Sequence, residues 1–164
     1  MSFPLSGLSV RVALALGLAC GAAAPAVAWD NLYIFGDSLS DTGNNGRYTF
    51  DSDRYPLYDE ILASHYGVTL SPSDKGGTNY AAGGGVAVPA IGDDNTQDQV
   101  QRYLSQTGGR ADKNGLYIHW VGGNDLGAAV LNPLQATSIV SGSATAAASQ
   151  VRTLLNAGAV TVIV

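Results

Sequence analysis

Cysteine and clustered positive charge are what this sequence has least of. Its 164 residues include one cysteine, Cys20, so the segment after it can form neither an internal disulfide bond nor a cysteine-based metal site. The 8 lysines and arginines are scattered, 13 acidic residues outnumber them, and the net charge is −5. Because nucleic-acid phosphates are bound by clustered cations, this distribution excludes a nucleic-acid-binding surface.

Charge is also nearly absent from the first 28 residues, where Arg11 is the only charged side chain. The apolar stretch 12–19 is shorter than the roughly 20 residues that a transmembrane helix needs. It is followed by Ala26-Val27-Ala28, which has the small-x-small pattern of a signal-peptide cleavage site. We therefore interpret residues 1–28 as a signal peptide, expect export to the medium or the cell surface, and assign residues 29–164 to the mature protein.

The remaining sequence alternates short apolar runs with stretches typical of helices. Strands are expected at 32–35, 68–70, 79–81, 116–121 and 160–164, and helices at 56–66, 97–106 and 137–156. This order predicts an α/β fold: a parallel sheet with helices on both faces, in a flavodoxin-like three-layer arrangement with right-handed crossovers. The last expected strand has no cap or polar tail after it, so we expect the chain to be the N-terminal part of a larger domain.

A serine follows the first expected strand, within Phe35–Asn44 (FGDSLSDTGN). Ligands of open parallel sheets bind at the carboxyl ends of the strands, which is where Ser38 falls. On a turn that leads into a helix, its hydroxyl would be a nucleophile beside backbone N–H groups that stabilise negative charge. The alternative is an ordinary turn in which Asp37 or Ser38 only caps a helix, and a lone Gly-Asp-Ser favours that alternative.

Two further motifs favour the interpretation of Ser38 as a nucleophile over that of a turn residue. Phe35–Asn44, Asn79–Gly84 (NYAAGG) and Gly122–Asp125 (GGND) resemble, in order, the first three blocks of the GDSL (SGNH) serine hydrolases, especially secreted bacterial esterases and lipases that are autotransporter passengers. The resemblance covers residues 31 to about 164. It implies an SGNH-hydrolase fold, a small-molecule or lipid ester as substrate, an acyl-serine intermediate and no metal or organic cofactor. It also allows for an outer-membrane β-barrel further along the complete protein.

The same resemblance assigns an oxyanion hole. In this family the charged oxygen of the tetrahedral intermediate is held by three donors: the nucleophile N–H, the N–H of a second-block glycine and the side-chain amide of a third-block asparagine. These correspond to Ser38, Gly84 and Asn124. Gly83 is the alternative for the middle donor, because a run of three glycines permits a shift by one position. Glycine suits this role because its backbone can approach a ligand closely.

Neighbouring residues are expected to support these groups. The supporting set is Gly36, Asp37, Gly83 and Gly123. Asp37 is expected to shape the turn by hydrogen bonding rather than to act as a triad acid, and Asp125 to begin a helix. Without the other two motifs, Asn124 would be interpreted as an ordinary turn residue.

No residue of the sequence fits the role of catalytic base. The family draws its triad Asp and His from a late Asp-x-x-His segment, whereas Leu62 and Leu116 stand three residues before the only two histidines, His65 and His119. His65 is expected to interact with a helix end and His119 to be a satisfied core residue. No acidic residue follows Asp125. The triad Asp and His are therefore expected outside this chain.

Two other functions fit the same residues. Without its base, the chain would be an inert or degenerate domain that at most binds acyl or glycan ligands. An acyltransferase would use the same acyl-serine but pass the acyl group to an alcohol instead of water. The acyl-chain preference is not encoded in a recognisable motif, because the pocket walls are expected to come from loops such as 44–55 and 85–96 and from the C-terminal part that is expected outside this chain.

Overall fold

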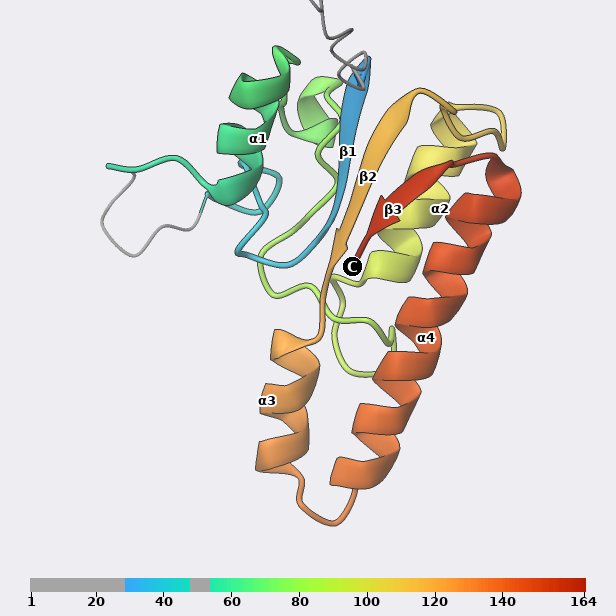
Figure 1. Ribbon diagram of the computed structural model, residues 1–164. Helices are drawn as coiled ribbons and strands as arrows, with labels where there is room; N and C mark the ends of the chain where they lie inside the picture. Colours follow the sequence, from blue (N-terminus) through green and yellow to red (C-terminus); the bar gives the residue numbers. More distant parts are fainter. Residues whose placement is uncertain (1–28, 48–53) are drawn as a thin grey trace, which may run out of the picture.

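The computed structural model describes residues 29–47 and 54–164. The expected signal peptide, residues 1–28, lies outside the described residues, and so do residues 48–53 of the expected pocket wall. In chain order the elements are β1 (Asn31–Gly36), α1 (Tyr58–Tyr66), a 3-10 turn (Ser73–Lys75), α2 (Thr96–Gln106), β2 (Gly115–Trp120), α3 (Gly123–Leu131), α4 (Ala136–Ala157) and β3 (Thr161–Ile163) (Figure 1). None of the described helices is long and apolar enough to cross a membrane.

The three strands form one parallel sheet in the order β1-β2-β3. Leu32 of β1 lies opposite Leu116 of β2, which in turn lies opposite Thr161 of β3. All three strands therefore point to the same edge of the sheet, where Gly36 at the end of β1 lies opposite Trp120 at the end of β2 (Figure 1). The predicted parallel α/β sheet is confirmed.

Different helices cover the two faces of the sheet, because successive side chains of a strand point to opposite sides. One face contributes Tyr33, Phe35 and Tyr117 to a core with Val100 and Tyr103 of α2 and Leu154 of α4. The other contributes Leu32, Ile34, Leu116 and Ile118 to a core with Ala63 of α1. Figure 1 shows α1 on one side of the sheet and α2 and α4 on the other. The predicted three-layer arrangement is thus confirmed.

The predicted helices agree with the observed ones to within two residues, but two predicted strands are wrong. Residues 68–70 pair with no strand, because Pro72 and the 3-10 turn redirect the chain at once. Residues 79–81 run beside β1 but form only isolated parallel bridges, from Asn79 to Ile34 and to Pro72. Three backbone bonds still attach this segment to β1: Ile34 N–H to Thr78 O (3.1 Å), Tyr80 N–H to Ile34 O (2.8 Å) and Ala82 N–H to Gly36 O (3.2 Å).

Candidate active site

Ser38 lies on a tight turn at the carboxyl end of β1. Asp37 holds this turn: its carbonyl accepts the Ser40 N–H (3.1 Å) and its Oδ1 accepts the Leu39 N–H (3.0 Å). The expected helix after Ser38 is not formed, because Gly43 has a φ of +135°, outside the helical region, and residues 37–46 are turns and bends. A helix dipole from this segment therefore does not act on Ser38.

The Ser38 turn is anchored through Gly36. The Gly36 N–H donates to Gln99 Oε1 (2.8 Å) and Gln99 Nε2 donates to the Gly36 carbonyl (2.8 Å). A Cβ on Gly36 would lie 2.3 Å from the Trp120 carbonyl oxygen, so only glycine fits between the ends of β1 and β2. Sequence reasoning missed Gln99. The available signal was a polar residue next to Val100 and one turn before Tyr103, on the buried side of an amphipathic helix.

The second motif packs directly on this turn. A Cβ on Gly85 would lie 2.5 Å from the Gly36 carbonyl oxygen. The three consecutive glycines differ in what their N–H groups do: Gly83 donates to Asp41 Oδ2 (2.8 Å) and Gly85 to the Ala82 carbonyl (3.0 Å). The Gly84 N–H has no acceptor within residues 29–47 and 54–164, and Gly84 is exposed with a φ of +84°.

The third motif begins α3 and contacts the other two. Asn124 Nδ2 donates to the Gly85 carbonyl (2.9 Å). A Cβ on Gly123 would lie 3.8 Å from Asp37 Oδ2. Asp125 is in the first turn of the helix, as expected, and is buried; its carboxylate accepts the Ala87 N–H (3.0 and 3.1 Å). It also accepts the Ser143 hydroxyl of α4. The three motifs therefore meet at one edge of the sheet.

Buried carboxyl groups surround the Ser38 turn. Burial raises the pKa of Asp37, and the negative charge of Asp125 raises it further. Burial also raises the pKa of Asp59 to about 7. Asp59 Oδ2 accepts from Asn79 Nδ2 (3.0 Å), which also donates to the Ser40 carbonyl (2.7 Å). Burial thus disfavours the ionised forms of Asp37 and Asp59 next to the turn.

Neither histidine reaches Ser38. His119 is buried in β2 with Nε2 2.9 Å from Gln150 Oε1; since that oxygen can only accept, Nε2 carries the proton. Burial lowers the pKa of His119, which favours the neutral ring. His65 is exposed near the end of α1, against the ring of Tyr66. Within the described part of the chain the Ser38 hydroxyl makes no hydrogen bond.

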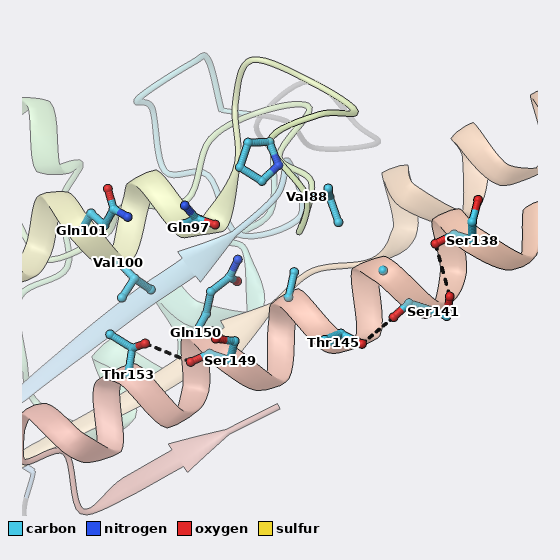
Figure 2. Close-up of a pocket in the computed structure, with 13 residues that line it drawn as sticks. Val88, Gln97, Val100, Gln101, Ser138, Ser141, Thr145, Ser149, Gln150 and Thr153 are labelled. Carbon is cyan, nitrogen blue, oxygen red and sulfur yellow. Dashed lines mark hydrogen bonds between the residues drawn. The ribbon is translucent and has the colours of Figure 1, made fainter. Parts of the chain in front are cut away.

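A large hollow lies away from the three motifs. It has a volume of about 710 Å³, is bounded by α2, α4 and the loop at Val88, and is lined mainly by hydroxyl and amide side chains (Figure 2). Thr145 and Thr153 donate their hydroxyl protons to carbonyls one turn earlier in α4 (2.8 and 2.9 Å). No residue of the three motifs lines this hollow. Among the described residues, no group of three or more His, Cys, Asp or Glu side chains could hold a metal ion.

Fold and site together place the chain in the class of three-layer α/β domains that carry their site at the carboxyl edge of a parallel sheet. Within that class the chain belongs to the GDSL-like lipase/acylhydrolase family, whose model matches residues 32–163. It is 54% identical over 153 residues to a protein named Lipase 1 from Photorhabdus luminescens. The match covers 91% of this chain and 24% of Lipase 1, so the chain spans about a quarter of that relative's length.

Proposed function

We propose that this chain supplies the nucleophile and the oxyanion hole of a carboxylic-ester hydrolase. Ser38 Oγ attacks the ester carbonyl carbon, the C–O bond to the alcohol breaks, and an acyl-serine remains until water releases the acid. The proton of the Ser38 hydroxyl passes through a base to the departing alcohol oxygen. The observation that carries this proposal is a Ser38 hydroxyl without a partner, among the described residues, at the edge where the three motifs meet.

The pattern of hydrogen bonds supports Gly84, rather than Gly83, as the second oxyanion donor. An oxyanion hole needs donors that are not already used, and in residues 83–85 only the Gly84 N–H lacks an acceptor in the described structure. The Ser38 N–H is likewise without an acceptor there. Asn124 Nδ2 uses one hydrogen on the Gly85 carbonyl and keeps a second for the substrate oxygen. We propose Ser38, Gly84 and Asn124 as the three donors.

The base is proposed to come from outside these 164 residues. His119 is committed to Gln150, and His65 lies on α1 without contact to the Ser38 turn. An Asp-x-x-His segment elsewhere in the complete protein would supply the triad acid and base. Loss of the base from a serine triad can lower kcat by about a millionfold. The 164-residue chain by itself is therefore expected to be nearly inactive.

We also propose that the protein is exported by a signal peptide at 1–28 and that its catalytic part is the passenger of an autotransporter. The support for export is the single charge of this segment and its small-x-small end at Ala26-Val27-Ala28. N-terminal sequencing of the exported protein should give Trp29 as the first residue. An N-terminus at Met1, or retention in the cytoplasm, contradicts the proposal.

The function is tested with Ser38→Ala in the complete protein. Hydrolysis of a short-chain aryl ester should fall by at least about a thousandfold, and labelling by a fluorophosphonate, which reacts with activated serines, should disappear. Ser141→Ala, in the α4 hollow, is the matched control and should behave as the unmodified protein. Full turnover by Ser38→Ala would rule the assignment out. Product analysis with added alcohol separates hydrolysis from acyl transfer.

A further inference from the structure

Asp41, three residues after the proposed nucleophile, is fully buried and accepts four backbone N–H groups. Its Oδ1 accepts from Gly43 and Asn44 (both 2.7 Å) and its Oδ2 from Asn45 (2.9 Å) and Gly83 (2.8 Å). Three of these bonds are local and only shape the loop. The fourth reaches 42 residues along the chain, to the glycine before the proposed oxyanion donor.

Asn45 binds the carbonyl group of the same glycine. Its Nδ2 donates to the Gly83 carbonyl (3.0 Å). Because a trans peptide is planar, the Gly83 carbonyl and the Gly84 N–H belong to one rigid unit and point in opposite directions. A side chain that fixes the direction of the Gly83 carbonyl therefore fixes the direction of the Gly84 N–H as well.

Side-chain packing around Gly84 does not fix the direction of its N–H. A Cβ built on Gly84 would meet no atom within 4 Å, and Gly84 is exposed. The positive φ of Gly84 belongs to a region that glycine enters freely, so local sterics leave the peptide several orientations. Of the two hydrogen bonds on Gly83, the one from Asn45 Nδ2 to the carbonyl holds the Gly83–Gly84 peptide itself, and the one from the Gly83 N–H to Asp41 holds the adjoining Ala82–Gly83 peptide.

We infer that Asp41 and Asn45 are positioning residues of the oxyanion hole. Asn45 holds the Gly83–Gly84 peptide through its carbonyl, and Asp41 holds the Asn45 backbone and the adjoining Ala82–Gly83 peptide, so that the Gly84 N–H faces the substrate oxygen. This inference rests on the proposed function of Ser38 and Gly84. Neither side chain touches the substrate in this arrangement. Asp41 must supply acceptors on both oxygens, a requirement that a carboxylate meets and an amide does not.

The first test is Asp41→Asn in the complete protein. The amide nitrogen has to face two N–H donors in either orientation, so the loop should shift. We expect kcat on an aryl ester to fall at least about tenfold, less than the ~10²–10³ for loss of a whole donor, with KM changed less than threefold. Binding of an alkylboronic acid, whose tetrahedral adduct places an oxygen in the oxyanion hole, should weaken by a similar factor.

The matched control is Asp112→Asn. Asp112 accepts from Asn31 Nδ2 (3.0 Å), the Tyr33 hydroxyl (3.3 Å) and the Asn114 N–H (2.9 Å), near the opposite end of β1. This variant should lose thermal stability while kcat and boronic-acid binding stay unchanged. Equal kcat values in Asp41→Asn and Asp112→Asn would overturn the inference and reduce Asp41 to a structural role.

If Asp41→Asn does not fold, the positioning role is tested with two substitutions at exposed positions. Asn45→Ala removes the exposed amide that donates to the Gly83 carbonyl and, over a longer distance, to Asp94 Oδ2 (3.3 Å). Asn114→Ala removes an exposed amide that donates to Asp30 Oδ2 (2.8 Å). We expect kcat to fall about three- to tenfold in the first and not in the second. An unchanged kcat in Asn45→Ala would contradict the inference. Full activity of Ser38→Ala would instead overturn the proposed function, so the two failures are distinguishable.

Discussion

The side-chain amide of Gln99 closes a two-point hydrogen bond on the backbone of Gly36, 63 residues earlier in the chain. Gly36 is the buried last residue of β1; its carbonyl also accepts the Ala82 N–H (3.2 Å), whereas Gln99 is the acceptor of its N–H. Gln99 thereby attaches α2 to the point where the chain turns toward Ser38. The geometry of the candidate nucleophile is set by a helix that contributes no residue to the three motifs.

Gln99→Leu should therefore destabilise the protein and disturb the site. The buried Gly36 N–H loses its acceptor, which costs about 1–3 kcal/mol in the free energy of unfolding. Ester hydrolysis should fall together with the urea midpoint. Gln101→Leu, on the exposed side of the same helix, serves as the control and should change neither quantity. An unaltered urea midpoint for Gln99→Leu would contradict the anchoring role.

Asn124→Ala should separate binding from catalysis. The proposed donor stabilises charge that develops only in the transition state, so kcat should fall by about 10²–10³ while KM changes little. Asn132→Ala, at the other end of α3, removes an amide that bonds only the Ala128 carbonyl (2.9 Å) and should retain normal kinetics. A rise in KM with an unchanged kcat would show that Asn124 contributes ordinary substrate binding.

Asp59 should make stability depend on pH. Burial raises its pKa in the folded state to about 7 from the ordinary 3.8, so the folded protein holds the Asp59 proton where the unfolded chain has released it. The free energy of unfolding should consequently decrease as pH rises from about 4 to about 7, by up to about 4 kcal/mol from this group. Urea titrations at several pH values measure the slope.

Asp59→Asn is the variant that isolates this slope. It cannot ionise, so its stability curve should lack the Asp59 contribution between pH 4 and 7 and retain the contribution of Asp37, whose pKa burial also raises. Curves of the same slope for the variant and the unmodified protein would show that Asp59 ionises normally in the folded state.

The layers of this fold could be predicted because they follow from local patterns. Leu32–Phe35 and Leu116–Val121 are apolar runs of strand length, and the helix that ends before Gly158 has a long alanine-rich pattern with a glycine stop. α3 was recognised only through its first turn, because its nine residues include glycines at 123 and 127 that weaken a helix pattern. The segment 68–70 was mistaken for a strand because three apolar-rich residues do not reveal the turn that follows.

The motif residues of the candidate site could be proposed from the sequence, whereas the residues that hold these motifs in place could not. Ser38, Gly84 and Asn124 stand in recognisable motifs, so their positions were readable without a structure. The contacts of Asp41 and Gln99 span 42 and 63 residues, and only the folded chain brings their partners together. The alignment of the motif favours Gly84 over Gly83, and the hydrogen bonds of the glycine run support that proposal.

The Gly83–Gly84 peptide is fixed by hydrogen bonds and not by packing. Thermal stability and oxyanion stabilisation can therefore change independently in this loop. A substitution that lets this peptide rotate removes no apolar contact, because a Cβ at Gly84 has no neighbour within 4 Å. Asn45→Ala, at an exposed position, is such a variant, and we expect it to keep its melting temperature and still lose oxyanion stabilisation. A thermal-shift screen would accept it as intact, so variants of this loop have to be ranked by turnover or by inhibitor affinity.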